Sequence, residues 1–324
     1  MNRQALVFTG PRRVEVVDEA LDAPGPGQVL VRASVSAISA GTELLAFRGQ
    51  IPPELPLDDT LGAMAGRTFA FPFRFGYASV GQVIEAGAGA EAWQGRQVFA
   101  FHPHASAFAV PAQDLVAVPG DLPAERAVLL AAMETAVNLV LDGQPLVGER
   151  VVVVGQGMVG LLTTALLARF PLERLQAIEA VPLRAEAARA LGAEVVAAGE
   201  AREADLVYEL SGDPAALDLA LAAAGREGRV IVGSWYGAKR AAVDLGGGFH
   251  RGRVTVRSSQ VSRIAPALSA RWDRARRFAA AWRALAALDA RPLVSHRFPF
   301  AQAQQAYQLL DRAPDRALQV LLLH

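Results

Sequence analysis

The sequence predicts an α/β protein in which a doubly wound parallel sheet follows a β-rich region. Short apolar runs separated by Gly and Pro fill the first 120 residues. Strands then alternate with helices from Arg150 onward, and a glycine-rich turn joins the first of these strands to its helix. The length of 324 residues fits two domains.

The composition limits the classes of function. The 32 Lys and Arg residues balance 32 Asp and Glu residues, so the long-range attraction needed for nonspecific binding to nucleic acid or an anionic membrane is missing. The chain has no cysteine, which excludes disulfides, iron–sulfur clusters and thiolate zinc sites. Met1–Gln4 leads into a segment without an apolar signal core, and we expect a cytoplasmic protein.

Short strands are expected in the first part of the chain, because each run is enriched in apolar residues and bounded by turn residues. A turn-rich pattern of this kind is typical of a compact β barrel or sandwich. The expected strands are Gln4–Phe8, Arg13–Val17, Gln28–Ser36, Val80–Glu85, Gln97–Phe101, Phe108–Pro111 and Leu115–Val118.

The pattern becomes helical at Pro123–Leu141, where apolar residues recur at helical spacing. The alternation that follows is typical of a parallel sheet covered on both faces. Its expected strands are Val151–Val154, Leu175–Glu179, Leu206–Leu210 and Arg229–Gly233, and its expected helices are Met158–Arg169, Leu183–Leu191 and Ala215–Ala224.

Two segments near the end of the chain need separate interpretation. Arg271–Leu288 combines five arginines with an apolar stripe, and we interpret it as a surface helix with a solvated arginine face rather than a nucleic-acid or membrane helix. Leu318–Leu323 is strand-like and no helix follows it, so we expect it to rejoin the first domain.

Gly155-Gln156-Gly157-Met158-Val159-Gly160 is a GxGxxG motif between an apolar strand and an apolar helix. Gly155 permits the tight turn, Gly157 lets the backbone approach a pyrophosphate, and Gly160 lets the helix pack on the strand. The helix N-terminus presents unpaired N–H groups to the phosphates. The glycines also interrupt the uncharged stretch Val151–Ala168, which argues against a membrane span. The motif therefore predicts a Rossmann dinucleotide site.

Glu179 ends the second strand, 19 residues beyond Gly160. A carboxylate there accepts hydrogen bonds from the adenosine ribose and repels a 2′-phosphate, so NAD is predicted in preference to NADP. Arg184 follows one helical turn later, either as a solvated arginine or as a cofactor contact.

Several motifs across almost the whole chain resemble medium-chain dehydrogenases/reductases. They are, in order, Gly27–Arg32, Gly41-Thr42-Glu43-Leu44, Gly76–Gly87, the dinucleotide motif and Ser211-Gly212-Asp213-Pro214. Ser39–Glu43, Gly76–Gly81 and Ser258–Val261 are similar to the branch that includes bacteriochlorophyllide 2-desacetyl-2-hydroxyethyl dehydrogenase. The resemblance implies a GroES-like β-rich catalytic domain over residues 1–121 and 292–324, a Rossmann domain over residues 122–291, cofactor contacts at Ser211 and Gly212, and a homodimer.

The sequence departs from the zinc enzymes of that superfamily at their ligand positions. Ala40 and Ala131 stand where those enzymes have cysteines, and Tyr77 replaces a histidine. The loop with four cysteines for structural zinc is also missing. The resemblance therefore implies an enzyme without zinc of the family type.

His102 and His104 flank Pro103 and would face the same side of an extended chain. Two imidazoles are too few for a metal site, which would need a third ligand such as Glu43. The alternatives are a hydrogen-bonded or surface pair and a role of His104 in substrate binding. We predict no bound metal.

Without zinc, hydrogen-bond donors must stabilise the substrate oxygen during hydride transfer. The resemblance makes Thr42 the hydroxyl that relays the proton, and it points Tyr77 at the vacated metal position, where a phenol can donate to a carbonyl. We assign Tyr77 as the oxygen-binding donor, Thr42 as the relay and His104 as the proton exit. The structural alternatives are a Tyr77 ring that only fills space and a Thr42 hydroxyl bonded to backbone.

The function implied by the resemblance is a zinc-independent, NAD(P)(H)-dependent oxidoreductase that moves hydride between nicotinamide and a small alcohol/carbonyl substrate. Two alternatives stay open. One is reduction of an enone or quinone, and the other is a dinucleotide-binding sensor or structural protein without turnover.

Overall fold

The computed structural model describes all of Met1–His324 and divides into two compact units. Unit 1 comprises Met1–Ala131 and Val294–His324, and unit 2 comprises Ala132–Leu293. The domain boundaries expected from the sequence, at residues 121/122 and 291/292, stay a prediction.

Unit 1 is built mainly on antiparallel strands, and each of the strands expected in the first part of the chain is present. β1 (Asn2–Gly10) and β2 (Arg13–Ala20) form a two-stranded sheet. A seven-stranded sheet has the order β14-β15-β3-β4-β5-β7, with β6 paired to β3. Its strands are β3 (Gln28–Ile38), β4 (Ser79–Ala86), β5 (Gln97–Ala100), β6 (Ala107–Pro111), β7 (Leu115–Ala117), β14 (Val294–Pro299) and β15 (Gln319–Leu323).

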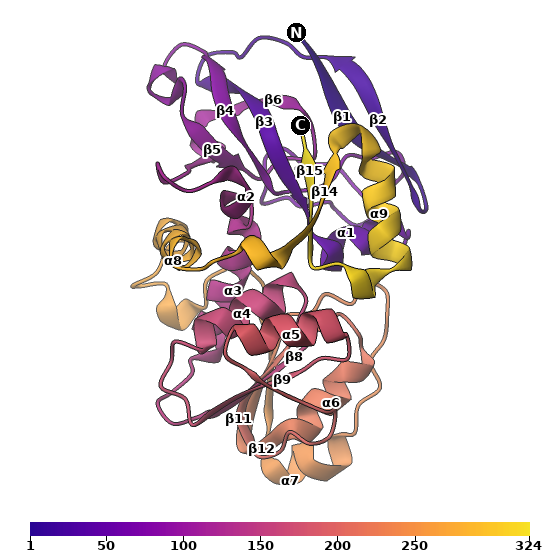
Figure 1. Cartoon of the computed structure of the whole chain (residues 1–324), viewed down its shortest axis with the longest axis vertical. Helices are drawn as coiled ribbons and strands as arrows, with labels where there is room; N and C mark the ends of the chain where they lie inside the picture. Colours follow the sequence, from indigo (N-terminus) through magenta and orange to yellow (C-terminus); the bar gives the residue numbers. More distant parts are fainter. The chain divides into compact units, whose positions relative to one another are not determined.

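The last strand confirms that the C-terminal segment returns to unit 1. β15 pairs antiparallel with β3, with Val320 opposite Ile38, and Figure 1 shows the yellow β15 beside the indigo β3. On its other side β15 pairs in parallel with β14, a strand that the sequence did not predict.

Two helices of unit 1 were not expected, α1 (Ala40–Phe47) and α9 (Ala303–Arg312). α9 buries residues at helical spacing, including Ala303, Ala306 and Tyr307, against the sheet and α1. The Tyr307 ring stacks on the Phe47 ring with 5.2 Å between the ring centroids, and it contacts the Phe8 ring edge-on with 5.4 Å between the centroids. This aromatic packing fixes Tyr307 beside α1, which begins immediately after Ser39.

Unit 2 has the doubly wound parallel sheet that the sequence predicts. Its six strands are all parallel, in the order β10-β9-β8-β11-β12-β13, and helices pack around them (Figure 1). The strands are β8 (Arg150–Val154), β9 (Arg174–Ile178), β10 (Glu194–Val196), β11 (Ala204–Glu209), β12 (Ala224–Val232) and β13 (Thr255–Ser258). The helices are α3 (Leu130–Gly143), α4 (Met158–Leu167), α5 (Pro182–Ala190), α6 (Ala215–Ala223), α7 (His250–Gly252) and α8 (Arg274–Ala286).

Two helical predictions need correction. The single helix expected over Pro123–Leu141 is two helices, α2 (Ala124–Ala127) and α3, because the apolar spacing continues across the break without a Gly or Pro to mark it. The arginine face of α8 is not wholly solvated. Arg277 is buried and donates to Glu134 at 2.6 and 3.1 Å and to Asn138 Oδ1 at 2.7 Å. Each of the three guanidinium nitrogens of Arg277 thus has an acceptor on α3, which ties α8 to α3.

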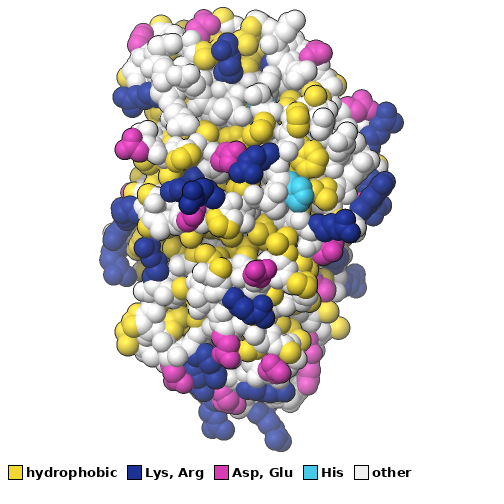
Figure 2. All heavy atoms as spheres, in the orientation of Figure 1, with side chains coloured by type: hydrophobic (Ala, Val, Ile, Leu, Met, Phe, Trp, Pro, Cys, Tyr) yellow, Lys and Arg dark blue, Asp and Glu magenta, His cyan; other side chains and the backbone are white.

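No helix has the length and apolar composition that a membrane span would need, and the stretch Val151–Ala168 consists largely of β8 and α4. Figure 2 shows positive and negative side chains interspersed on the visible face, in agreement with the zero net charge.

Candidate active site

The glycine motif follows β8. In the sheet of unit 2, β9 and β10 lie on one side of β8 and β11, β12 and β13 on the other, so the strand order reverses at β8. Gly155 has φ +87°, and a Cβ there would lie 2.5 Å from Ser211 Cα. A Cβ at Gly160 would lie 2.1 Å from the Gly155 carbonyl oxygen. At Gly157, which caps α4, no atom lies within 4 Å of the Cβ position. The loop Gly155–Gly160 therefore has no room for a side chain at Gly155 or Gly160 but has open space at Gly157, in front of the N-terminus of α4. This geometry fits a diphosphate.

Side chains hold this loop in place. The Gln156 side chain is buried, donating to Val153 O at 3.4 Å and accepting from Thr164 Oγ1 at 3.0 Å. Glu179 accepts the backbone N–H of Gln156 at 2.7 Å and that of Val181 at 2.8 Å. Each carboxylate oxygen of Glu179 keeps further acceptor capacity, so the residue can brace the loop and still bind a ribose hydroxyl.

The remaining predicted cofactor residues lie at the starts of helices and at the end of β11. Met158 and Val159 form the first turn of α4, and Arg184 lies in the first turn of α5. The N–H of Gly212 donates to Ser234 Oγ at 2.8 Å. Ser211 donates its N–H and its hydroxyl to the buried carboxylate of Glu209, at 2.9 and 2.5 Å.

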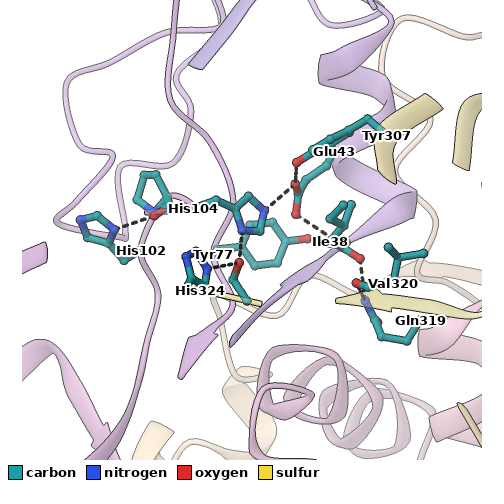
Figure 3. Close-up of polar contacts among 12 residues, drawn as sticks. Ile38, Glu43, Tyr77, His102, His104, Tyr307, Gln319, Val320 and His324 are labelled. Atoms are coloured by element: carbon teal, nitrogen blue, oxygen red, sulfur yellow. Dashed lines mark hydrogen bonds and ion pairs between the residues drawn. The ribbon is translucent and has the colours of Figure 1, made fainter. Parts of the chain in front are cut away.

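A second group of polar side chains lies in unit 1, around the start of α1 (Figure 3). The phenol of Tyr77 donates to Ser39 Oγ at 2.5 Å. Burial, and then the nearby carboxylate of Glu43, raise the pKa of Tyr77 to about 12, while hydrogen bonds with Ser39 and Thr42 lower it. Tyr77 therefore keeps its proton at neutral pH and acts as a donor, not a base. Since Ser39 Oγ accepts this proton, its own hydroxyl proton is available to a further acceptor.

Glu43 is a fully buried carboxylate surrounded by donors. It accepts the Ser39 N–H at 2.8 Å, the His104 Nε2–H at 3.0 Å and the hydroxyl of Tyr307. Burial and then Glu43 raise the pKa of Tyr307 well above its ordinary value, so this phenol is also a permanent donor. Thr42 lies half-buried in the same helical turn, and its backbone N–H donates to Ser39 O at 3.1 Å.

His104 connects this carboxylate to a chain of hydrogen bonds. Its ring is fully buried against Gly76, where a Cβ would lie 2.4 Å from His104 Cδ2. His104 Nδ1 lies 2.8 Å from Ser36 Oγ, which lies 3.0 Å from His324 Nε2. With Nε2–H donating to Glu43, Ser36 donates to Nδ1 and accepts from His324, so the chain has one consistent direction.

His102 does not share this environment, contrary to the expectation that the two histidines face the same side. Figure 3 shows His102 pointing away from the cluster that holds His104. Its ring stacks on Phe108 at 4.1 Å, and its Nδ1–H donates to Pro103 O at 2.7 Å.

The lowered pKa values of two histidines predict that the free energy of unfolding depends on pH. Burial lowers the pKa of His102 and that of His324 from 6.5 to about 3. The unfolded chain binds these protons below pH 6.5 and the folded chain does not, so the stabilisation is complete above pH 6.5 and is lost as the pH falls toward 3. Each histidine contributes up to about 1.4 kcal/mol per pH unit in this window.

We expect the thermal unfolding temperature to fall steeply from pH 7 to pH 4.5. In His102→Asn the fall should be shallower, because unfolding then takes up about one proton fewer. The matched control is His250→Asn, at an exposed position, which should retain the wild-type slope. An equal slope in His102→Asn and wild type would contradict the assignment.

Comparison with known proteins shows which enzymes the chain resembles. No family model matches the chain. The 2-desacetyl-2-hydroxyethyl bacteriochlorophyllide A dehydrogenase of Rhodobacter capsulatus is 25% identical over an alignment of 334 positions, gaps included. The alignment spans 97% of this chain and 96% of that enzyme. The enzyme of that name from Cereibacter sphaeroides is 28% identical over 259 residues, 73% of this chain and 75% of that enzyme. The alcohol dehydrogenase of Thermus sp. ATN1 is 25% identical and superposes with a TM-score of 0.78 over 99% of each chain.

In sequence and in fold the chain is similar to enzymes of the medium-chain dehydrogenase/reductase superfamily. It is an alcohol dehydrogenase-like oxidoreductase. Its fold is shared with an alcohol dehydrogenase of Escherichia coli CFT073 complexed with NADH, at 18% identity and a TM-score of 0.81 over 100% of this chain and 99% of the other. A putative zinc-binding dehydrogenase of Sinorhizobium meliloti 1021 bound to NADP has 17% identity and a TM-score of 0.80 over the whole of both chains.

The residues of this chain do not fit zinc at the position where zinc enzymes of that superfamily are expected to bind it. Ala40 and Ala131 offer no ligand atom, and the phenol of Tyr77 is bonded to Ser39. No group of three His, Cys, Asp or Glu side chains in the chain could hold a metal ion.

The sequence analysis missed five residues of the two groups: Ser36, Ser39, Glu209, Tyr307 and His324. Ser39 had a visible signal, because a hydroxyl directly precedes the Ala40-Gly41-Thr42 motif. Tyr307 and His324 gave no signal, since they lie 264 residues from Glu43 and 288 residues from Ser36. Glu209 lies within the predicted strand Leu206–Leu210 and is the last residue of β11, and nothing in the sequence marked it as a buried acceptor.

Proposed function

We propose that this chain transfers hydride between a nicotinamide coenzyme and an alcohol/carbonyl substrate without zinc. The observation that carries the proposal is the hydrogen bond from Tyr77 to Ser39, at the position where zinc enzymes of the superfamily are expected to have a ligand. Because Ser39 Oγ accepts from Tyr77, the Ser39 hydroxyl keeps its own proton to donate, and such a donor stabilises an oxygen that becomes negative during reduction.

The other residues of unit 1 have supporting roles in the proposed reaction. Tyr77 was expected from the sequence to donate to the substrate oxygen itself, but its phenol donates to Ser39. In the proposal it therefore orients the Ser39 hydroxyl and strengthens it as a donor, since hydrogen bonds in a chain polarise one another. Thr42 is the second hydroxyl of this turn and serves as the proton relay. Glu43 is a positioning residue that holds the Ser39 backbone, and His104 begins the chain through Ser36 along which a proton leaves.

The coenzyme when bound supplies or accepts the hydride at its nicotinamide ring. Residues of unit 2 would hold it: the glycine loop binds the diphosphate, and Glu179 accepts from the adenosine ribose. The relatives in fold include one protein with NADH and one with NADP, and the carboxylate of Glu179 favours NAD. The proposed contacts are Gly155, Gln156, Gly157, Met158, Val159, Gly160, Glu179, Arg184, Ser211 and Gly212.

The test is a fluorescence titration with NADH and NADPH, followed by turnover assays. We expect NADH to bind at least about tenfold more tightly, because a 2′-phosphate would meet the Glu179 carboxylate. We also expect reduction of aldehydes or ketones by protein free of zinc by elemental analysis. The panel includes secondary alcohols, enones and quinones with both coenzymes.

Tighter binding of NADPH would overturn the coenzyme assignment. Stoichiometric zinc in active protein would overturn the metal-free mechanism. Turnover of enones or quinones alone would replace the proposed substrate class, and tight coenzyme binding without any turnover would replace catalysis by a sensor or structural role.

A homodimer and a cytoplasmic location are further proposals. The homodimer is supported by β13, an edge strand of the unit 2 sheet whose four residues are all exposed, including Val256 at 42%. An exposed strand edge of this kind is suited to pairing with a second chain.

A further inference from the structure

Unit 1 contains a cavity of about 380 Å³, and of the residues given a role in the proposed reaction only His104 lines it. Its lining includes Arg3, Arg67 and Arg74, together with His102 and Asp114. Pockets for small molecules begin at about 300 Å³, and this volume corresponds to about a dozen water molecules. The cavity is therefore large enough for a small metabolite.

The arginines of this cavity are not balanced by carboxylates. Arg3 and Arg74 share one partner, Glu19, at 2.6 and 2.5 Å. The Nε of Arg74 is buried and has no hydrogen-bond partner. Arg67 is exposed and forms no ion pair. The nearby carboxylates are Asp114, which lines the cavity, and Glu19, which pairs with Arg3 and Arg74. Three guanidinium groups against two carboxylates leave one net positive charge.

His102 adds an acceptor to this wall. Because its Nδ1–H donates to Pro103 O, its Nε2 is the unprotonated nitrogen of a neutral ring. Burial is the main cause that lowers the pKa of His102 to about 3, and the positive charges of Arg3 and Arg67 lower it further. The histidine therefore does not add to the positive charge of the cavity at neutral pH.

We infer that this cavity binds a small organic anion whose carboxylate or phosphate group is held by Arg67 and Arg74. Guanidinium groups match both oxyanions with paired N–H donors, and Arg67, which forms no ion pair, has these donors available at the cavity. His102 Nε2 and Asp114 accept hydrogen bonds from a hydroxyl or amino group on the same molecule. The inference does not depend on the proposed function, since it uses neither coenzyme nor turnover.

The test uses the full chain without coenzyme and two probes, inorganic phosphate and malonate, titrated by calorimetry at constant ionic strength in chloride. We expect saturable binding of one equivalent of at least one probe, weakened at least about tenfold in Arg67→Gln, because a charged hydrogen bond to the oxyanion is lost. Arg67→Lys keeps the charge but not the paired donors, and its affinity should lie between the two.

The matched control is Arg96→Gln, an exposed arginine of unit 1 that lies over Trp93 and does not line the cavity. It should bind the probes as wild type does. Phosphate binding alone identifies a phosphoryl ligand and malonate binding alone a carboxylate ligand. The absence of saturable binding of either probe, or equal affinities in Arg67→Gln and Arg96→Gln, overturns the inference.

Discussion

Gly157→Val should weaken NADH binding by at least about 100-fold while leaving the fold intact, because a side chain at this position fills the space where the diphosphate must approach the backbone. No protein atom lies within 4 Å of the Cβ position, and the φ of −67° is one that valine adopts. The measurement is a fluorescence titration with NADH, accompanied by the thermal unfolding temperature.

Two further glycines serve as controls for this result. Gly120→Val also places a side chain in open space, but in unit 1, and should bind NADH as wild type does. Gly160→Val should lower the unfolding temperature, since its Cβ would lie 2.1 Å from Gly155 O. Unchanged NADH affinity in a stable Gly157→Val would show that the diphosphate does not rest on this loop.

The second large effect is expected at Ser39. Ser39→Ala should lower kcat by about 100-fold on the best carbonyl substrate of the panel, because loss of a single donor to a developing oxyanion costs about this much. Tyr77→Phe keeps the ring and removes the proton that orients Ser39, so a smaller fall of about tenfold is expected. KM and the NADH dissociation constant should change little in both variants, since the lost interaction strengthens in the transition state.

Ser34→Ala is the matched control for Ser39→Ala, because Ser34 is an exposed serine of β3 that donates to Val80 O at 3.1 Å. Its kcat should equal that of wild type. A Ser39→Ala variant with wild-type kcat would remove Ser39 from the chemistry, and unchanged kcat in Tyr77→Phe would leave that ring a space-filling role.

The parts predicted well are those encoded by neighbouring residues. Strand–helix alternation and the GxGxxG spacing lie within short windows, so the parallel sheet and the cradle at Gly155 and Gly160 followed from the sequence. α1 was missed because its first turn coincides with the Ala40-Gly41-Thr42 motif and Ser39 forms no side-chain cap. α9 likewise has no side-chain cap.

The network around Glu43 could not be predicted in the same way. Its members come from β3, α1, α9 and the segment before β6, and only tertiary packing brings them together. The same reason explains why the burial of Arg277 was not predicted. In the sequence it is one of several arginines of a surface helix, and its partners on α3 are distant: Glu134 is 143 residues away and Asn138 is 139 residues away. A local pattern identifies a residue's type and face but not a distant partner.

The pairing of β15 with β3 has a consequence for how the protein is made. Residues near position 38 can pair with β15 only after residues near position 320 have been synthesised, so the sheet of unit 1 closes only after the whole of unit 2 has left the ribosome. Unit 2, whose strands all lie within Ala132–Leu293, is complete earlier. Tyr307 also follows unit 2 in the chain, so Glu43 acquires this donor only after unit 2 has been synthesised. The nascent chain therefore contains all residues of the parallel-sheet unit before it contains all residues of the group around Glu43.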